Sequence, residues 1–408
     1  MPDPITFFIS AGEASGEHYG ALLTAALKRR LAEAEVRAHF IGMGGARMEA
    51  AGLERVVRAE DVAVMGLTEV VRHLPKIYRE YRKLKRTIRT QRPAAAVLID
   101  SPEIHLRLAR EFHRLGIPVI YFVSPQLWAW KKHRIRLVQR YVRRMAVIFP
   151  FEERFYRERG VEADFVGHPL ADLPLPAVRR EEFAAQNNLD PARTWIGLLP
   201  GSRAREIGAH LPEMLNAARM LAEDGLKEQF EFIIPLAPTL KPEQRRAIRQ
   251  QVDDLARGLP VFLVDEARAT LRHARASLVA SGTATVEAAL IGNPFVVVYR
   301  VSPATFAIAK RVVKVPHVAM PNLIAGRRVV PELIQNDFTA SNCVQYISRL
   351  LPEGADRQSM MEELAAVGSI LRSHPASGRG GNAIERVAEI VLEQLGGSPL
   401  RQAAHLST

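Results

Sequence analysis

Short runs of apolar residues alternate with longer amphipathic stretches through the first part of the chain. The runs have the length of strands, and the stretches between them have the apolar spacing of helices. Predicted strands lie at residues 5–9, 37–41, 95–99 and 118–123, and predicted helices at residues 21–34, 106–115 and from 67 onward, with Pro75 suited to the first turn of a new helix. Strands that alternate with helices in this way are typical of right-handed βαβ units, so we expect a parallel sheet.

The same alternation begins again after a proline-rich connector at residues 168–176. Predicted strands follow at residues 195–199, 231–235, 261–264, 276–280 and 295–301, with predicted helices at 206–224 and 244–256. A last amphipathic helix is expected at about residues 382–395. The pattern therefore predicts an α/β protein with two similar parallel-sheet domains.

Four glycine-rich or proline-rich junctions directly follow predicted strands and lead into helical patterns. They lie at residues 10–17, 124–130, 199–203 and 281–287, two in each half of the chain. Ligands of open parallel sheets bind beyond the carboxyl ends of the strands, where helix N-termini present N–H groups to anions. We therefore expect one substrate in each half and chemistry in a cleft between them.

Composition indicates a globular protein but does not distinguish among several kinds of binding partner. The 408 residues are 48% apolar, which is enough for two or three globular domains. Neither a membrane-spanning run nor a signal peptide is recognised, and the single Cys343 fits a reducing cytoplasm. The net charge of +12 is concentrated around residues 76–92 and 131–144, and it suits nucleic acid, anionic lipid or phosphorylated substrates equally well.

Asp100 is the candidate general base. It ends the apolar run at residues 94–99, so it is expected at the carboxyl end of a buried strand. The alternative is that Asp100 caps the helix that begins near Ile104, which is a common use of aspartate. Position alone leaves both interpretations open.

The second half contains two candidate anion-binding loops. In the loop at residues 199–207, Arg203 suits bidentate contact with phosphate, whereas the alternative is an ordinary helix cap beside a solvated arginine. In the loop at residues 280–287, small residues allow close approach of a nucleotide, and Glu287 is placed to accept ribose hydroxyls or, alternatively, to cap a helix. Neither loop matches a Walker or dinucleotide-binding motif, and no histidine or Asp-x-Asp spacing predicts a metal.

Two apolar features have both a functional and a structural interpretation. Trp128 and Trp130 either stack on a sugar or an acyl chain or fill the core. The helical stripe within residues 62–92 either faces the core or, because it adjoins the basic run, lies at a membrane surface.

The chain closely resembles the lipid-A-disaccharide synthase family of bacterial glycosyltransferases over nearly its whole length. The resemblance is carried by SAGEASGE at residues 10–17, GMGG at 42–45, VMGLTEV at 64–70, LIDSPE at 98–103, YFVSPQLWAWKKHRI at 121–135, FVGHPLAD at 165–172, LLPGSRAREI at 198–207, SGTATVEAAL at 281–290 and MPNLIAGRRVVPELIQNDFTA at 320–340. The family pattern often has aspartate at the position of Glu17.

The resemblance implies a GT-B-like architecture, in which two Rossmann-like domains flank a cleft and the chain end returns to the first domain. Residues 1–176 would bind the acceptor and face the membrane, residues 177–360 would bind the UDP-sugar, and residues 361–408 would form a helical tail that packs back on the first domain or on a partner subunit. The activity implied is an inverting transfer from UDP-2,3-diacylglucosamine to 2,3-diacylglucosamine 1-phosphate. A cytoplasmic enzyme peripheral to the inner membrane is expected, without cofactor, metal or nucleic acid, with a possible homodimer.

The resemblance and the residues together give the expected site. Asp100 is the catalytic base. Residues expected at the donor are Gly201, Ser202, Arg203, Glu206, Gly282, Thr283, Ala284, Glu287, Asn322 and Arg327. Residues expected at the acceptor are Glu13, Ser15, Glu17, Ser124, Gln126, Trp128 and Trp130. Residues expected to face the membrane are Leu67, Val70, Val71, Leu74, Arg82, Lys83, Lys85 and Arg86.

Two other classes of protein fit parts of the pattern. A UDP-sugar 2-epimerase shares the fold, but it needs no acyl-binding surface, so the apolar and basic stretch at residues 62–92 speaks against it. A basic nucleic-acid-binding protein would leave the four ligand loops without a role.

Overall fold

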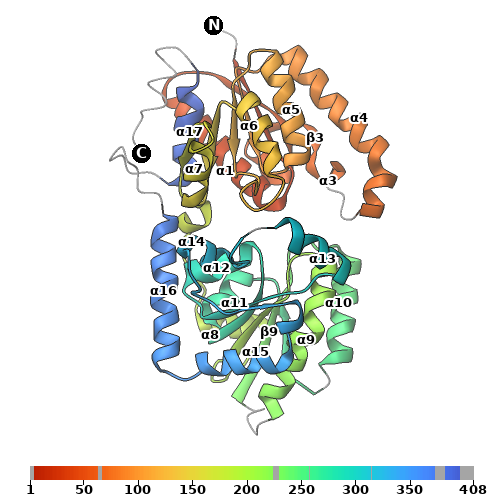
Figure 1. Cartoon of the computed structure of the whole chain (residues 1–408), viewed down its shortest axis with the longest axis vertical. Helices are drawn as coiled ribbons and strands as arrows, with labels where there is room; N and C mark the ends of the chain where they lie inside the picture. The colour runs from red at the N-terminus through yellow and green to blue at the C-terminus, as the bar shows by residue number, and fades with distance from the viewer. Residues whose placement is uncertain are drawn as a thin grey trace. The chain divides into compact units, whose positions relative to one another are not determined.

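The computed structural model describes residues 4–62, 67–223, 229–256, 258–313, 315–372 and 382–395, with only the backbone described at residues 67–74. The chain divides into two compact units, residues 1–172 with 371–408 and residues 173–370 (Figure 1). The first division lies near the expected boundary at 176. The second lies beyond the expected boundary at 360, because helix α16 (Ala355–Leu371) continues unbroken past it.

The first unit is built on a seven-stranded parallel sheet of order β3-β2-β1-β4-β5-β6-β7. Its strands are β1 (Ile5–Ala11), β2 (Ala38–Gly44), β3 (Leu53–Arg58), β4 (Ala95–Ile99), β5 (Val119–Phe122), β6 (Arg144–Val147) and β7 (Ala163–Phe165). The four strands predicted here are confirmed, and they carry the continuous apolar runs of strands covered on both faces. Strands β3, β6 and β7 were not predicted, because β3 and β7 are polar edge strands and β6 is short and begins at an arginine.

Helices cover this sheet. They are α1 (Ala14–Glu33), α2 (Ala46–Ala50), α3 (Ala59–Val62), α4 (Leu67–Gln91), α5 (Pro102–Arg114), α6 (Ile135–Tyr141), α7 (Pro150–Arg157) and α17 (Ala383–Glu393), with 3-10 turns at Lys132–Arg134 and Pro169–Asp172. The expectation that a new helix starts at Pro75 is wrong, since α4 runs through this proline. Helix α1 begins seven residues earlier than expected, at 14 rather than 21, so the conspicuous loop at residues 10–17 includes its first turn.

The end of the chain returns to the first unit, as expected. Arg30 of α1 is 2% exposed, and its Nε lies 2.7 Å from Glu385 Oε2 of α17. Asn382 caps α17 by accepting the N–H of Glu385, and the N–H of Ala383 donates to Asp172 at 2.8 Å. A buried arginine needs a carboxylate partner, so these bonds fix α17 against α1.

The second unit is built on a six-stranded parallel sheet of order β10-β9-β8-β11-β12-β13. Its strands are β8 (Thr194–Leu199), β9 (Phe230–Pro235), β10 (Val261–Val264), β11 (Ala276–Ala280), β12 (Phe295–Tyr299) and β13 (Glu332–Ile334). The five predicted strands are confirmed, whereas the three-residue β13 was missed. The fold is thus GT-B-like, with two Rossmann-like parallel-sheet units and a returning C-terminal segment.

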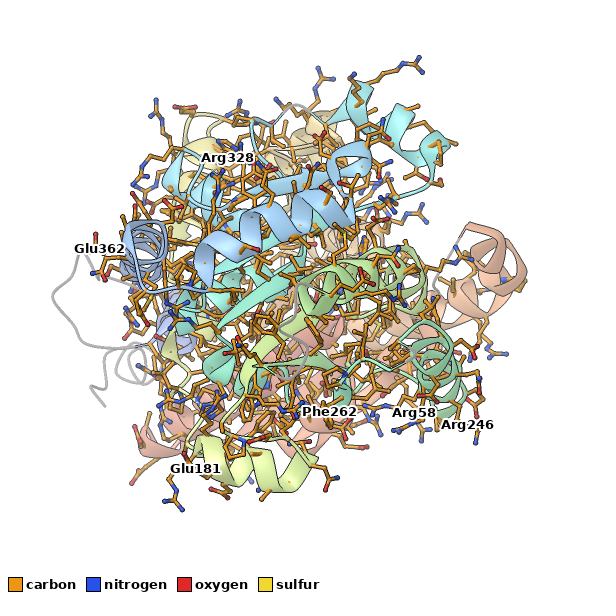
Figure 2. The ribbon with its side chains drawn as sticks, turned by 90° about the horizontal axis from the view of Figure 1, so that it is seen from below. Arg58, Glu181, Arg246, Phe262, Arg328 and Glu362 are labelled. Carbon is orange, nitrogen blue, oxygen red and sulfur yellow. The ribbon has the colours of Figure 1, made fainter. Side chains whose placement is uncertain are left out.

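The helices of the second unit complete its layers. They are α8 (Arg180–Asn187), α9 (Ala204–Glu223), α10 (Pro242–Leu255), α11 (Ala267–His273), α12 (Thr283–Ile291), α13 (Pro303–Val312), α14 (Met320–Ala325), α15 (Ala340–Ile347) and α16, with 3-10 turns at Gln335–Asp337 and Ser348–Leu350. Figure 2 shows Glu181, Arg246 and Glu362 pointing outward from α8, α10 and α16. No helix within the described part of the chain is long and apolar enough to cross a membrane.

Candidate active site

Asp100 lies immediately after β4, at the carboxyl edge of the first sheet. Its backbone is left-handed, with φ of 53°, and that of Ser101 is also left-handed, with φ of 42°. Side chains larger than glycine rarely adopt this conformation, and it persists only where surrounding contacts hold it. The turn from β4 into α5 is therefore a strained junction that presents the carboxyl group of Asp100.

Two buried side chains hold the main-chain oxygen of Asp100. His105 Nδ1 lies 2.8 Å from this oxygen, and the Tyr121 hydroxyl donates to it as well. Because a carbonyl oxygen only accepts, Nδ1 carries the proton, and Nε2 accepts from the Ser10 hydroxyl at 2.8 Å. Burial lowers the pKa of His105 to about 4, so the imidazole is neutral. This support was not predicted from the sequence, where it is indicated by no more than a histidine near the start of α5.

The carboxyl group of Asp100 faces the first turn of α1. Its Oδ1 accepts the N–H of Gly12 at 3.3 Å, whereas its Oδ2 is buried and has no hydrogen-bond partner among the described residues. A Cβ atom at Gly16 would lie 1.8 Å from Oδ2. Gly16 is thus required so that the helix start can approach the carboxyl group closely.

Burial raises the pKa of Asp100 to about 7, against partial compensation by hydrogen bonds from Ser101, Gly12 and Glu13. A carboxyl group with a pKa near neutrality is suited to accept a proton from a substrate hydroxyl. The alternative interpretation, in which Asp100 caps α5, does not match the geometry. Ser101 occupies the cap position, and the Asp100 carboxylate bonds across to Gly12.

The expected acceptor residues divide into an exposed group and a group whose side chains have partners within the unit. Glu13, Ser15 and Gln126 are exposed, and Trp130 is 40% exposed beneath Lys131 Nζ, which lies 4.0 Å from its ring centroid. Glu13 and Ser15 follow the carboxyl end of β1, and Gln126 and Trp130 follow that of β5, so these exposed residues belong to segments at the same edge of the sheet as Asp100.

Glu17, which is half-buried, and Ser124 form the second group. Glu17 Oε1 accepts the N–H of Arg47 at 2.7 Å and so holds the start of α2. The Ser124 hydroxyl is buried and lies 3.0 Å from Tyr156 Oη. For both residues the structure shows an internal role.

Trp128 is half-buried and connects the loop at residues 124–130 to a buried carboxyl group, Glu152, that was not predicted from the sequence. Its Nε1 donates to Glu152 Oε1 at 3.0 Å, and its ring packs edge-on against Phe151. Glu152 is 1% exposed, and burial raises its pKa to about 7. Since Glu152 also accepts the N–H of Phe149 at 3.2 Å, it ties the tryptophan to the start of α7.

In the second unit, Glu206 forms hydrogen bonds with the loop that follows β8. Glu206 Oε2 lies 3.3 Å from the N–H nitrogen of Ser202, and Glu206 Oε1 lies 3.0 Å from Arg203 Nη1. A Cβ atom at Gly201 would lie 2.8 Å from Glu206, so the glycine admits the carboxylate. Glu206 therefore occupies N–H groups that were expected to face the donor.

A buried histidine braces this loop as His105 braces the loop in the first unit. His210 Nδ1 donates to the main-chain oxygen of Pro200 at 2.7 Å, and its Nε2 accepts the N–H of Arg300 at 2.9 Å. Burial lowers the pKa of His210, which keeps the ring neutral. The end of β8 is thereby fixed to the end of β12.

The loop after β11 is more open. Gly282 has φ of 151°, a conformation that favours glycine, and α12 begins directly after it with Thr283 and Ala284. The first N–H groups of a helix lack intrahelical partners and are suited to anions. Thr285 is buried, and its hydroxyl donates back to Gly282. Glu287 lies one turn into α12, and burial raises its pKa against weak compensation from Arg268.

Asn322 and Arg327 were both expected at the donor. Asn322 is fully buried, and its side chain bonds to the N–H groups of Val329 and Val330, the oxygen of Val330 and the carboxylate of Glu332. These bonds use all of its donors and acceptors, so the structure shows Asn322 as a brace of this turn. Arg327 is exposed and pairs with Glu363.

The basic surface of α4 is only partly free. Arg82, Lys83 and Arg86 are exposed, whereas Lys85 Nζ lies 3.1 Å from the buried carboxylate of Glu111. The expected apolar stripe lies outside the described side chains, since only the backbone is described at Leu67, Val70, Val71 and Leu74.

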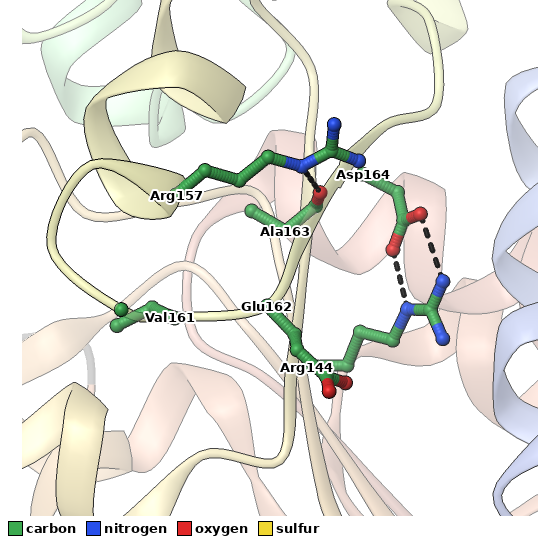
Figure 3. A pocket seen from close by; sticks show the side chains of 7 residues that line it. Arg144, Arg157, Val161, Glu162, Ala163 and Asp164 are labelled. Atoms are coloured by element: carbon green, nitrogen blue, oxygen red, sulfur yellow. Dashed lines mark hydrogen bonds and ion pairs between the residues drawn. The ribbon is translucent and has the colours of Figure 1, made fainter.

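A shallow hollow of about 450 Å³ lies at the opposite edge of the first sheet, at the starts of β6 and β7 (Figure 3). Within it, Arg144 forms a bidentate ion pair with Asp164, and Arg157 donates to the main-chain oxygen of Ala163. The hollow is thus separate from Asp100, which lies at the carboxyl edge of the same sheet.

Comparison with known proteins identifies close relatives in sequence. A family model described as lipid-A-disaccharide synthetase matches residues 7–373. A lipid-A-disaccharide synthase from Acidobacterium capsulatum is 59% identical over 404 residues, covering 97% of this chain and 98% of that protein. Another from Koribacter versatilis is 50% identical over 385 residues, covering 94% and 97%.

Solved structures share the fold at low sequence identity. A UDP-GlcNAc 2-epimerase from Neisseria meningitidis, bound to UDP-GlcNAc, superposes with a TM-score of 0.62 at 13% identity, covering 96% of this chain and all of that one. A calicheamicin glycosyltransferase superposes with a TM-score of 0.55 at 17% identity, covering 97% and 99%. At such identities, these similarities show the fold alone.

Proposed function

The chain belongs to the lipid-A-disaccharide synthetase family, and from that premise we propose that it joins UDP-2,3-diacylglucosamine to 2,3-diacylglucosamine 1-phosphate. The products are the lipid A disaccharide 1-phosphate and UDP, with inversion at the anomeric carbon of the donor. The protein is therefore a glycosyltransferase of lipid A biosynthesis.

Asp100 acts as the general base in this proposal. The observation that supports the assignment is that Oδ2 is buried and has no hydrogen-bond partner within the described part of the chain. Oδ2 takes the proton of the acceptor 6-hydroxyl. As the proton leaves, the 6-oxygen of the acceptor attacks the anomeric carbon of the donor and forms the new glycosidic bond. The bond from this carbon to the diphosphate breaks, and UDP leaves with the electron pair. His105 and Tyr121 keep the carboxyl group in place through the main chain.

The donor binds to the second unit. We place the diphosphate at the start of α12, where the N–H groups of Thr283 and Ala284 meet the charge that develops on the leaving group. Arg203 adds a cation, and Glu287 accepts the ribose hydroxyls. Glu206 supports Arg203 through its 3.0 Å contact with Nη1.

Association with the cytoplasmic face of the inner membrane follows from the substrates, because both carry acyl chains. The exposed cations Arg82, Lys83 and Arg86 of α4 suit an anionic lipid surface. This part of the proposal assigns the segment at residues 62–92 to membrane contact in the acceptor-binding unit.

A coupled assay tests the function. Purified protein is incubated with UDP-2,3-diacylglucosamine in the presence and absence of the acceptor, in excess EDTA, and both UDP and disaccharide are measured. With the acceptor present, we expect the amount of UDP released to equal the amount of disaccharide formed. Without the acceptor, we expect neither product. Formation of a 2-epimer of a UDP-sugar without an acceptor would instead identify an epimerase, and a complete loss that Mg²⁺ restores would contradict transfer without a metal.

A further inference from the structure

Helix α13 leaves its apolar side chains uncovered. All ten of its residues are described, and none is buried. Ser302 caps the helix by accepting the N–H of Thr305 at 3.3 Å, and Pro303 occupies the first turn, so local sequence is sufficient to start it. Ile308 is 63% exposed and Val312 is 46% exposed. Figure 1 shows α13 at the margin of the second unit.

Two further exposed valines, Val313 and Val318, follow the end of the helix in the chain. Of the twelve large hydrophobic side chains that are exposed among the described residues, four lie within residues 308–318. Scattered exposed hydrophobic residues are ordinary, whereas a cluster of them indicates an interaction surface. We call this cluster, together with the neighbouring cations Lys310 and Arg311, the α13 surface.

The charge of the segment that carries this cluster is positive, although one carboxylate from outside the segment, that of Glu332, accepts the N–H of Val318 at 3.1 Å. From Tyr299 to Pro331 the chain contains six lysine and arginine residues and no aspartate or glutamate. Arg300 and Arg327 pair with glutamates from other segments. Lys310 and Arg311 are exposed, and neither forms an ion pair within the described part of the chain. The α13 surface therefore complements a partner that is both apolar and anionic.

Helix α13 lies at the same edge of the second sheet as the two loops proposed to bind the donor. Helix α13 follows the carboxyl end of β12, and the loops at residues 199–203 and 281–287 follow the carboxyl ends of β8 and β11 in the same parallel sheet. These ends share one edge of the sheet. An acylated sugar nucleotide bound at this edge would come from a membrane, so contact between this edge and the bilayer shortens its path.

We propose that the α13 surface docks the second unit onto an anionic phospholipid bilayer. Ile308, Val312, Val313 and Val318 enter the interfacial layer, while Lys310 and Arg311 contact lipid phosphates. This gives the donor-binding unit a membrane contact of its own, distinct from that assigned to α4 in the first unit. The inference rests on the proposed function only in that the substrates carry acyl chains.

Cosedimentation with vesicles tests the proposal without any substrate, so its outcome is independent of the catalytic assignment. The vesicles contain phosphatidylglycerol and phosphatidylethanolamine. The apolar variant combines Ile308→Ser, Val312→Ser and Val313→Ser, and we expect its vesicle affinity to fall at least about ten-fold at both low and high salt. A matched variant combines Met220→Ser, Met361→Ser and Ile370→Ser, which are similarly exposed in the same unit, and its affinity should not change.

A second pair of variants tests the charge. Lys310→Ser with Arg311→Ser should reduce affinity roughly five-fold per cation at low salt and much less at high salt. Arg246→Ser with Arg249→Ser on α10 is the control, since both side chains are exposed and Figure 2 shows Arg246 pointing outward. Equal losses in the two charge variants would show only a non-specific effect of net charge and would overturn the proposal.

A direct readout locates the contact. Ile308→Cys labelled with a polarity-sensitive dye should shift to the blue on vesicles, whereas Met220→Cys should not; the native Cys343 is buried. No shift at residue 308 would overturn the proposal. A shift on dimerisation, seen by sedimentation velocity without vesicles, would identify a second copy of the chain as the partner. If the apolar variant bound vesicles as the wild type does but had a raised KM for a short-chain soluble donor, the α13 surface would contact the acyl chains of the donor rather than the bilayer.

Discussion

His105 Nδ1 lies 2.8 Å from the main-chain oxygen of Asp100, and this bond joins a neutral buried imidazole to a residue whose backbone is left-handed. The second unit repeats the device, with His210 Nδ1 at 2.7 Å from the oxygen of Pro200. Each histidine accepts a further hydrogen bond on Nε2, from Ser10 and from the N–H of Arg300 respectively. In both units, a buried histidine therefore fixes the chain where a strand turns into a candidate ligand loop.

Replacement of the proposed base is the first prediction. Asp100→Ala should lower kcat by about 10²- to 10⁴-fold while UDP binding remains, since the proposal assigns the base to the first unit and the nucleotide to the second. The wild-type rate should rise with pH up to the Asp100 pKa of about 7 and then level off, because only the ionised carboxylate accepts a proton. Steady-state kinetics and calorimetry with UDP check both. A variant with more than half of wild-type turnover would leave Asp100 without a catalytic role.

The buried carboxyl group should also affect stability. Its pKa is about 7 in the folded protein and has an ordinary value of 3.8, so the folded state binds the proton more tightly than the unfolded state. The stability of the wild type therefore falls as pH rises between these values. Asp100→Asn removes this dependence and should melt several degrees above the wild type at pH values above 7, with a smaller difference in acid. A melting-temperature difference that does not change with pH would contradict the raised pKa.

His105 should act as a positioning residue. His105→Leu removes the bond to the Asp100 oxygen and should lower kcat about 10²-fold with little change in the KM for the donor. His105→Asn offers an amide N–H near the position of Nδ1 and should restore part of the rate. Leu108→Ala, at a fully buried position on the same helix, is the control for simple destabilisation. An equal kcat loss per folded molecule in that control would refute a specific role for His105.

The donor site makes a separate prediction. Arg203→Ala and Glu287→Ala should each weaken UDP binding by roughly 1.5–3 kcal/mol, because each removes one charged hydrogen-bond partner. Uridine, which lacks the diphosphate, should be sensitive to Glu287→Ala alone. Titration calorimetry with UDP and uridine separates the two contacts. If both variants bound UDP with unchanged affinity, the loops at residues 199–203 and 281–287 would not form the donor site.

The cations of α4 should not be equivalent at the membrane. Arg82→Ser, Lys83→Ser and Arg86→Ser together should reduce cosedimentation with anionic vesicles mainly at low salt, because each cation contributes about 1 kcal/mol that salt screens. Lys85→Ser should reduce thermal stability more and vesicle binding less, since Lys85 pairs with the buried Glu111. The reverse ranking would show that Lys85 faces lipid.

The apolar stripe of α4 requires its own variant. Val70→Ser, Val71→Ser and Leu74→Ser together should reduce vesicle binding at every salt concentration if these side chains face lipid, because apolar insertion is not screened. A fall in melting temperature of several degrees, with unchanged vesicle binding by the folded protein, would place them in the core.

Local pattern determined much of this protein. The apolar runs predicted nine strands, the parallel βαβ organisation and the return of the last helix, because buried strands and amphipathic helices have periods that neighbouring residues reveal. The position of Asp100 after β4 was likewise readable, since loops at the carboxyl ends of parallel strands hold ligands. The resemblance of the ligand loops to a known family added the reaction.

Tertiary structure decided which side chains are free to act. Ser10 and His105 are 95 residues apart in the chain, and Arg30 and Glu385 are 355 apart, so no local period indicates that they bond. Long-range contacts likewise give Glu17 an internal partner. The polar edge strands escaped prediction because hydrogen bonds to a neighbouring strand, rather than an apolar run, hold them in the sheet. The exposure of Ile308 and Val312 on α13 was likewise decided by packing.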